Sequence, residues 1–292
     1  MLTKAQLDLA RWKSKPPDYF VECLQIQDKD TGKNHAFGLN THQRKIQDAI
    51  KSQRKAKKPV RIIILKPRQT GISTLSTANV FHGMRFGASP AMIVSKDMDS
   101  SEHIFSMAQR FMHYLPASEH ALLHTQASNR KEIKFEEPHG GRLIVETAGK
   151  TSAGHSFTVR SLLLSEVSRW PEGCEDAIVG LLAAVPYQPD TTIIIESVAN
   201  GMAGWFWKEW HKQESDYVKI FLPWYEHSEY SKPLPIDCAL YERRLTQEER
   251  QLISQYSTQR WVEYQSLPEP KPVHVEADFE ITLEQIEWRR WA

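Results

Sequence analysis

Short runs of consecutive apolar residues, many of them β-branched, recur along the chain, and each gives way to a stretch with helical spacing of apolar positions. The four clearest runs are residues 61–65, 91–95, 161–165 and 191–196. Because these runs do not alternate with polar residues, they predict strands covered on both faces, as in a mostly parallel sheet. The pattern therefore predicts an α/β fold with helices flanking the sheet.

Two further segments show the other strand pattern, in which apolar and polar residues alternate. Residues 132–136 and 142–146 alternate in this way and flank a Pro-His-Gly-Gly sequence at 138–141. Alternating segments joined by a glycine-containing turn predict a β-hairpin. We expect this hairpin at an edge of the sheet.

The character of the chain changes after Trp224. Tyr- and Pro-rich connections, with prolines concentrated at 232–235 and 268–272, surround two predicted helices. This change divides the chain into a core at 1–225, which includes an N-terminal helical segment, and a small subdomain at 226–292.

Capping boxes predict where three helices begin, because a Ser or Thr followed three residues later by Glu or Gln satisfies the first free amides of a helix. The pairs are Thr3 with Gln6, Thr246 with Glu249, and Thr282 with Gln285. Ile281 and Ile286 are placed to form a hydrophobic staple at the last of them. The chain ends within or just after this helix without a Gly or Pro, so we expect it to be part of a longer protein.

Composition is that of a folded protein without a strong charge bias. Of 292 residues, 40% are hydrophobic and 25% charged, with 37 Lys+Arg against 36 Asp+Glu. These values exclude a disordered chain and give no evidence from net charge for a polyanion-binding protein. The basic run at 51–58 is therefore interpreted first as a solvated helix face and only second as a DNA contact.

Targeting and metal signals are weak. The longest apolar run, at 177–185, is too short to span a membrane, and the first residues do not form a signal peptide, so we expect a cytoplasmic protein. Cys23, Cys174 and Cys238 are too widely spaced for a disulfide framework or a metal pair. The 12 His show no ligand spacing. We therefore expect reduced thiols and no structural metal.

A candidate phosphate loop follows the first apolar run. Its residues are Lys66, Pro67, Arg68, Gln69, Thr70, Gly71, Ile72, Ser73 and Thr74. A helix is predicted from Ser73 to Met84. A phosphate loop needs a glycine for close approach to the β-phosphate, a helix N-terminus, and a Ser or Thr hydroxyl for Mg²⁺, and Gly71 and Ser73 meet these needs.

The standard pattern GxxxxGK[ST] is not met. Lys66 stands where the first glycine belongs, and Ile72 stands where the lysine belongs. Phosphates still require a cation, and the long side chain of Lys66 can fold back over the loop, with Arg68 beside it. We interpret Lys66 as a relocated phosphate-binding lysine.

The run at 161–165 ends at Ser165 and Glu166. A carboxylate directly after a buried strand next to a phosphate loop is typical of a general base that orients the attacking water. Ser165 takes the position where an Asp usually supports Mg²⁺, so its support, like that of Glu166, would pass through water. The metal site would then comprise Ser73, Ser165 and Glu166.

Two other polar segments are candidates for nucleotide contacts. Glu196, Ser197 and Asn200 follow the run at 191–196 and would lie in the crevice at the carboxyl ends of parallel strands, where Asn200 could sense a γ-phosphate. Gln43, 19 residues before position 62, carries an amide that complements the N6/N7 edge of adenine. A surface role remains open for each of these residues.

Taken in order, these motifs resemble the ATPase half of the large terminase subunit, the genome-packaging motor of tailed double-stranded DNA bacteriophages. The motifs are Gln43, KPRQTGIST at 66–74, LLLSEVSRWP at 162–171, ESVANG at 196–201, FLPWYEHSEY at 221–230 and LEQIEWRR at 283–290. SEVSRWP and ESVANG are the most specific of them.

The resemblance implies a P-loop NTPase fold and Mg²⁺-dependent ATP hydrolysis coupled to movement of double-stranded DNA into a procapsid. It implies Gln43 at adenine, Lys66 and Arg68 at phosphates, and Glu166 at water. It also implies that Glu196, Ser197 and Asn200 form a coupling motif and that the segment from about 226 is a lid or linker. Implied partners are a homo-oligomeric ring, the small terminase subunit and the portal protein in the host cytoplasm.

The family also has a carboxyl-terminal nuclease domain, whose metal-binding acidic cluster is not found here. Glu276, Asp278 and Glu280 are too compact and too close to a helix cap. We therefore expect no DNA cleavage by this chain.

Several questions stay open from the sequence. An arginine from a neighbouring subunit would complete the site; Arg142 and Arg160 are candidates and Arg169 is a weaker one. Two alternative functions are a superfamily-2-like helicase or translocase, which would need a second phosphate-loop domain, and a non-hydrolysing assembly module with a degenerate site.

Overall fold

The computed structural model describes residues 3–87, 89–128, 131–137, 140–149, 158–257 and 281–292. Its helices are α1 (Lys4–Ser14), α2 (Pro16–Cys23), α3 (Thr41–Lys55), α4 (Ile72–Gly87), α5 (Met98–His113), α6 (Ala117–His120), α7 (Glu175–Ala183), α8 (Gly204–His211), α9 (Cys238–Arg243), α10 (Gln247–Ser257) and α11 (Leu283–Trp291), with 3-10 turns η2 (Val167–Arg169) and η3 (Trp224–Glu226). Its strands are β1 (Gln25–Gln27), β2 (Asn34–Ala36), β3 (Val60–Leu65), β4 (Pro90–Ser95), β5 (Thr125–Ser128), β6 (Glu132–Phe135), β7 (Arg142–Thr147), β8 (Ser161–Ser165), β9 (Thr192–Ser197) and β10 (Val218–Phe221).

An 8-stranded sheet in the order β10-β3-β9-β8-β4-β7-β6-β5 forms the centre of the molecule. The pairs from β10 to β7 are parallel, whereas β6 is antiparallel to both β7 and β5. All four strands predicted from apolar runs are confirmed as β3, β4, β8 and β9. The mostly parallel α/β fold is thereby confirmed as well.

The hairpin is confirmed, but its predicted edge position is wrong by one strand. β7 lies inside the sheet, parallel to β4, and the edge is β5, which pairs with β6. The polar sequence of β5, Thr-Gln-Ala-Ser, carries no apolar strand signal, which is why the sequence did not predict it. Residues 138–139 of the predicted turn lie outside the described residues.

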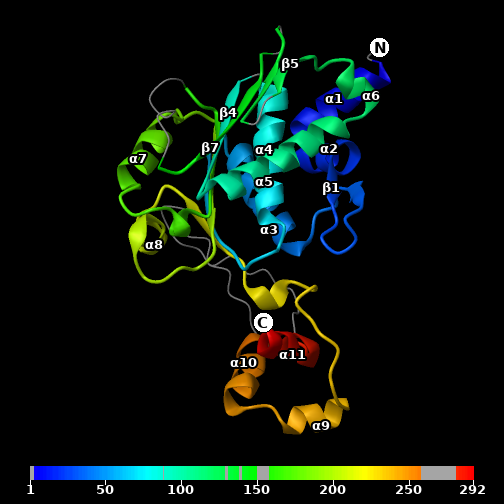
Figure 1. The fold of residues 1–292 in the computed structure, drawn as a ribbon, viewed down its shortest axis with the longest axis vertical. Coiled ribbons are helices and arrows are strands. Elements are labelled where there is room, and N and C mark those ends of the chain that lie inside the picture. The colour runs from blue at the N-terminus through cyan, green and yellow to red at the C-terminus, as the bar shows by residue number, and fades with distance from the viewer. Residues whose placement is uncertain (1–2, 88, 129–130, 138–139, 150–157, 258–280) are drawn as a thin grey trace.

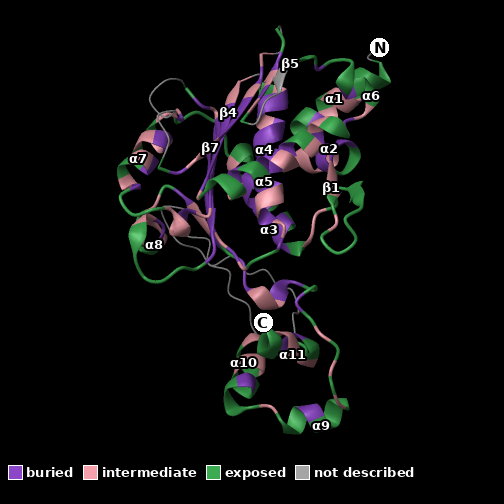
Figure 2. Ribbon diagram, in the orientation of Figure 1, coloured by how far each residue is buried: buried purple, intermediate pink, exposed green. Residues whose placement is uncertain are grey.

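Helices cover both faces of the sheet (Figure 1). On one face, Ile62, Ile64 and Ile194 pack in a cluster with apolar residues of α1 to α5. On the other face, Ile63 and Ile195 pack with α7 and α8. This alternation explains why β3 and β9 carry consecutive Ile residues, at 62–64 and 193–195, and Figure 2 shows the strands of the sheet as largely buried.

The residues after η3 form a smaller part below the sheet (Figure 1) with its own apolar cluster, which includes Tyr241, Ile281 and Ile286. The capping boxes at Thr3, Thr246 and Thr282 are confirmed by reciprocal hydrogen bonds. Sequence reasoning predicted two helices in this part and missed α9. The boundary at 226 stays a prediction, and the proline-rich stretch at 268–272 lies outside the described residues.

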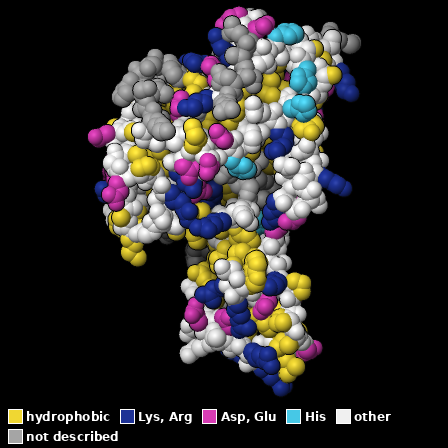
Figure 3. Space-filling model, in the orientation of Figure 1, with side chains coloured by type: hydrophobic (Ala, Val, Ile, Leu, Met, Phe, Trp, Pro, Cys, Tyr) yellow, Lys and Arg dark blue, Asp and Glu magenta, His cyan; other side chains and the backbone are white. Residues whose placement is uncertain are grey.

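Cys23, Cys174 and Cys238 are free thiols. Within the ranges given above, no helix is long and apolar enough to cross a membrane, and no group of three or more His, Cys, Asp or Glu side chains is arranged to hold a metal ion. On the face in Figure 3, basic and acidic side chains are interspersed. Residues Glu276, Asp278 and Glu280 lie outside the described part of the chain.

Candidate functional site

The candidate site lies at the carboxyl edge of the sheet, where β3, β9 and β8 end side by side. Leu65 is paired with Ser197, and Ser165 with Glu196. The residues that follow or end these strands, Lys66 among them, are therefore brought to one edge. Parallel strands produce this result directly, because all of their carboxyl ends point the same way.

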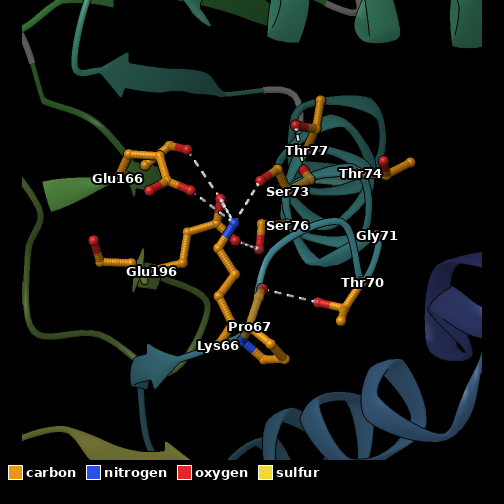
Figure 4. Close-up of polar contacts among 12 residues, drawn as sticks. Lys66, Pro67, Thr70, Gly71, Ser73, Thr74, Ser76, Thr77, Glu166 and Glu196 are labelled. Atoms are coloured by element: carbon orange, nitrogen blue, oxygen red, sulfur yellow. Dashed lines mark hydrogen bonds and ion pairs between the residues drawn. The ribbon is translucent and has the colours of Figure 1, made fainter. Parts of the chain in front are cut away.

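The Lys66 ammonium lies at the centre of the site. Its Nζ donates to the Ser73 hydroxyl at 3.0 Å and lies 3.0 Å from Glu166 Oε1 and 3.7 Å from Glu196 Oε1. Figure 4 shows the side chain extending from the end of β3 to a point between the two glutamates and the first turn of α4. The lysine before the glycine turn thus folds back to the beginning of the helix.

The surroundings of this ammonium are largely buried and acidic. The Lys66 side chain is 7% exposed and that of Glu196 0%, whereas Glu166 is 20% exposed. Burial lowers the pKa of Lys66, but the charges of Glu196 and Glu166 and their hydrogen bonds prevail and raise it above its ordinary value. The ammonium therefore stays charged, which a phosphate-binding role requires.

Glu196 is held by hydroxyl groups as well as by Lys66. Ser165 Oγ donates to Glu196 Oε1 at 2.9 Å, and Ser76 Oγ lies 3.4 Å from Oε2. A buried carboxylate is tolerated only when charges and hydrogen bonds compensate its desolvation. Ser165, Ser76 and Lys66 provide that compensation.

Gly71 makes the turn between β3 and α4. Its φ of +70° is in the left-handed region, and a Cβ there would lie 2.8 Å from Gln43 Nε2. The Gln43 amide donates to the Gly71 carbonyl at 2.8 Å, and Asn40 Nδ2 donates to the Thr70 carbonyl at 3.1 Å. These two side chains also form the capping box of α3. Gln43 is buried and fixes the loop, and its contact with adenine stays a prediction.

The other loop residues are divided between solvent and core. Arg68 and Gln69 are exposed, and Gln69 has a φ of +54°. Pro67 is half-buried and accepts from the Thr70 hydroxyl through its carbonyl. Ile72 and Thr74 lie in the first turn of α4 and have different surroundings. Thr74 Oγ1 lies 3.7 Å from Met107 Sδ, whereas Ile72 is buried in the apolar cluster with α1 to α5.

A second network, missed by sequence reasoning, ties the residues after Glu166 to the end of β9. The backbone amide of Ser168 donates to Ser197 Oγ at 3.0 Å, and the two hydroxyls lie 2.6 Å apart. Ser168 Oγ also donates to the Val198 carbonyl at 2.8 Å, and Asn200 Nδ2 donates to the Ser168 carbonyl at 2.7 Å. The serine three residues after Ser165 was the sequence signal available, but a lone Ser carries little information.

This network supports an unusual backbone conformation. Glu166 has a φ of +57°, in the left-handed region that non-glycine residues adopt at a cost. The 3-10 turn η2 follows directly, and Trp170 Nε1 donates to the Ser165 carbonyl at 2.9 Å. The strained turn aims the Glu166 side chain toward Lys66.

The three candidate arginines lie in different places. Arg142 begins β7 and pairs with Glu132, and Arg160 lies just before β8 and pairs with Asp190. Both are at the amino ends of parallel strands, on the edge opposite the phosphate loop. Arg169, in η2, is on the same edge as the loop.

The oxygen atoms around the Lys66 ammonium have the chemistry that Mg²⁺ prefers. Hard divalent cations bind hydroxyl and carboxylate oxygens, and Mg²⁺ commonly uses one or two carboxylates with phosphates and water. Ser73, Glu166 and Glu196 supply such oxygens, and these oxygens already surround one cation, the ammonium of Lys66. The residues present fit the metal.

Taken together, the parallel sheet, the glycine turn between β3 and α4, and the carboxylates on neighbouring strands define a P-loop ATPase fold of the ASCE class. The family profile described as "Phage terminase large subunit gpA, ATPase domain" matches residues 37–212, which is more than half of the chain. The chain therefore belongs to this family of phage terminase large-subunit ATPase domains. A comparison with curated proteins found no match.

Solved structures of phage terminases are similar at low sequence identity. The HK97 bacteriophage large terminase is 15% identical with a TM-score of 0.48, over 63% of this chain and 37% of that protein. The Thermus phage P74-26 large terminase ATPase domain is 15% identical with a TM-score of 0.48, over 74% of this chain and 92% of that domain. A large terminase from a thermophilic bacteriophage is 13% identical with a TM-score of 0.47, over 71% of this chain and 50% of that protein.

Proposed function

We propose that this chain is the ATP-hydrolysing motor domain of a phage DNA-packaging terminase, and that hydrolysis at the β3, β8 and β9 edge drives double-stranded DNA into a procapsid. Membership of the terminase ATPase-domain family supports the ATPase activity. The observation that carries the proposal for this chain is the convergence of the Lys66 ammonium, the start of α4 and the Glu166 carboxylate within hydrogen-bonding distance.

Phosphate binding falls to the loop and the lysine. The N-terminus of α4, a 16-residue helix, carries partial positive charge and free amide groups suited to phosphate oxygens. Lys66 adds a full charge in a buried setting, where electrostatic interactions are stronger than in water. Arg68 is exposed at the rim of the loop and can reach outer phosphate oxygens. Gln43 positions the loop through its bond to Gly71.

Glu166 is proposed as the general base. Its partial exposure admits a water molecule, while its backbone turn directs the carboxylate at the Lys66 region. Phosphoryl transfer relies mainly on positioning and charge, so the base need only orient and deprotonate the attacking water. Bound Mg²⁺ would be held through Ser73 and the nearby carboxylates and would neutralise charge on the transferred phosphate.

Coupling to DNA is proposed to pass through the end of β9. Ser197 and Asn200 bind Ser168, two residues after Glu166, so a change at the base reaches the β9 loop through hydrogen bonds. Family resemblance adds a homo-oligomeric ring, the small terminase subunit, the portal protein and the host cytoplasm as the setting. A trans-acting arginine, with Arg142 as the first candidate, belongs to the same proposal, as does a lid or linker role for 226–292.

The experiment that tests this function is ATP turnover by Glu166→Gln. The change removes the base but keeps size and hydrogen bonding, so phosphate release is expected to fall at least ~100-fold while binding of a non-hydrolysable ATP analogue is kept. Glu172→Gln, an exposed residue near the same turn, is the matched control and is expected to turn over normally.

Two outcomes contradict the proposal. Normal turnover by Glu166→Gln removes that residue from the mechanism. Analogue binding by the wild-type chain with no phosphate release, with or without DNA and at concentrations that favour assembly, supports the non-hydrolysing assembly module instead.

A further inference from the structure

We infer that Glu196, on β9, supplies the buried metal-supporting carboxylate of this site, in place of residue 165 on β8, and that Ser165 is the positioning residue that holds it. This inference rests on the proposed function, since it names the residue that supports the divalent cation of the nucleotide. It assigns to Glu196 a metal role, whereas the sequence pattern indicates only a coupling role.

The two side chains meet between neighbouring strands. Ser165 and Glu196 are register partners in the parallel pair of β8 and β9, and the Ser165 hydroxyl donates to Glu196 Oε1 at 2.9 Å. Glu196 therefore places a carboxylate oxygen within hydrogen-bonding distance of the position where the side chain of residue 165 ends. A carboxylate from the adjacent strand occupies the space into which an Asp at position 165 would extend.

Charge shows why only one of the two positions is acidic. Two carboxylates within hydrogen-bonding distance of each other in a buried site repel, and one of them is forced to bind a proton. With Glu196 0% exposed and Ser165 1% exposed, an acidic residue at both positions would be strongly unfavourable. A neutral hydroxyl at position 165 instead stabilises the Glu196 carboxylate.

The site as it stands has a deficit of positive charge. One ammonium, that of Lys66, is shared between Glu166 and Glu196, which leaves one negative charge before any phosphate is bound. Glu196 Oε1 also lies farther from Lys66 Nζ, at 3.7 Å, than Glu166 Oε1, at 3.0 Å. A divalent cation among these oxygens and Ser73 would offset part of the negative charge of the carboxylates and the phosphates.

The test is the affinity of Mn²⁺ for the ADP-bound protein, measured by electron paramagnetic resonance, with isothermal titration of ADP in EDTA as the second readout. Glu196→Gln keeps the hydrogen bond from Ser165 but removes the charge. Mn²⁺ affinity is expected to fall about 10–100-fold, the usual cost of losing a supporting group at a metal site. ADP affinity without metal is expected to change less than about twofold. Glu172→Gln is the control.

A reciprocal exchange makes the test specific and guards against a folding defect. The double variant Ser165→Asp with Glu196→Ser returns the carboxylate to β8, and it is expected to restore Mn²⁺ affinity to within about fivefold of wild type. A purely structural role as the Lys66 counter-ion predicts equal losses of ADP affinity with and without metal in Glu196→Gln.

Three results overturn the inference. Wild-type Mn²⁺ affinity in a folded Glu196→Gln variant excludes Glu196 as the supporting carboxylate. A folded double variant that does not bind Mn²⁺ excludes the exchange between strands. Failure of the wild-type chain itself to bind ADP with Mn²⁺ is a different result, because it removes the proposed nucleotide site and with it the inference.

Discussion

Ile72 and Lys66 together explain how a phosphate loop can lack the lysine that normally follows its glycine. The Ile72 side chain is 1% exposed and packs in the cluster beneath α4, where an ammonium would lose its hydration without compensation. Lys66 reaches the first turn of α4 from the end of β3, and its ammonium lies there beside the carboxylates of Glu166 and Glu196. The sequence predicted the folding back of Lys66, but not that both glutamates would surround it, because their distance depends on strand register.

Replacement of Gly71 is expected to affect both stability and nucleotide binding. Gly71→Ala introduces a side chain at a positive φ and forces Gln43 Nε2, 2.8 Å from the new Cβ, to give up its bond to the Gly71 carbonyl. We expect a loss of about 2–3 kcal/mol in unfolding free energy, of which about 1 kcal/mol is the backbone term. We also expect at least tenfold weaker binding of an ATP analogue. Urea unfolding and isothermal titration measure the two effects.

Gly173→Ala provides the matched control. Gly173 also has a positive φ, +81°, but its Cβ would meet nothing within 4 Å. Its substitution is expected to lower the unfolding free energy only by the about 1 kcal/mol that a side chain at positive φ costs. The affinity for the ATP analogue is expected to stay unchanged. Equal effects at the two glycines would contradict the account of Gln43 as the support of the loop.

At the scale of elements, the strands that carry the site were predictable and the strands at the borders were not. β3, β8 and β9 are buried on both faces, so each contains a run of consecutive apolar residues, at 62–65, 162–164 and 193–195. β10 is short and partly exposed, and its pairing with β3 depends on a contact distant in sequence. α2 begins at two prolines, which are equally typical of a turn.

The hydrogen bonds between η2 and the β9 loop can be tested by removing one hydroxyl group. Ser168→Ala removes the hydroxyl that bonds Ser197 and the Val198 carbonyl, and so loosens the turn that orients Glu166. We expect kcat for ATP hydrolysis to fall about tenfold with KM nearly unchanged, since misplacement of a base affects the transition state more than binding. Steady-state phosphate release measures both constants.

Ser14→Ala serves as the control, because Ser14 is exposed at the end of α1 and its hydroxyl is bonded to the Arg11 carbonyl of the same helix. It is expected to behave as wild type. A Ser168→Ala variant with a raised KM and unchanged kcat would show that the network acts on nucleotide binding and not on the base.

At the scale of the whole molecule, α3 connects the phosphate loop with the segment that leads to the smaller part. The helix carries Gln43 at its start, and Lys45, two residues further on, pairs with Glu226 of η3. Gln285 Nε2 of α11 donates to the Tyr225 carbonyl at 2.7 Å, and Trp288 stacks on Tyr230 with ring centroids 4.1 Å apart. Figure 3 shows apolar side chains gathered where the molecule narrows between the sheet and the smaller part. None of these long-range contacts could be predicted from periodicity.

His42 at this junction gives a prediction of pH dependence. Burial, followed by the charges of His227 and Lys45, lowers the pKa of His42 to about 3, although Glu226 Oε2 lies 3.8 Å from its ring. Because the folded-state pKa lies below the ordinary value of 6.5, the unfolded chain binds the proton more readily. The stabilising contribution of neutral His42 is present above about pH 6.5 and is lost as pH falls toward 3.

His42→Gln is therefore expected to reduce the loss of unfolding free energy between about pH 7 and pH 5 by roughly 1–2 kcal/mol. Urea unfolding at the two pH values measures it. His103→Gln, on the exposed side of α5, is measured in the same way as the control for a histidine change at the surface. An identical pH dependence for His42→Gln and wild type would show that His42 does not titrate on unfolding in this range.

We propose that the cation for the phosphates comes from before the glycine turn, and a crystal structure with a non-hydrolysable ATP analogue and Mg²⁺ shows whether it does. We expect the γ-phosphate within hydrogen-bonding distance, about 3 Å, of Lys66 Nζ, with the triphosphate at the start of α4 and Glu166 facing it across a water molecule. Nucleotide bound away from Gly71, or a Lys66 ammonium turned away from the phosphates with nucleotide in place, would contradict it.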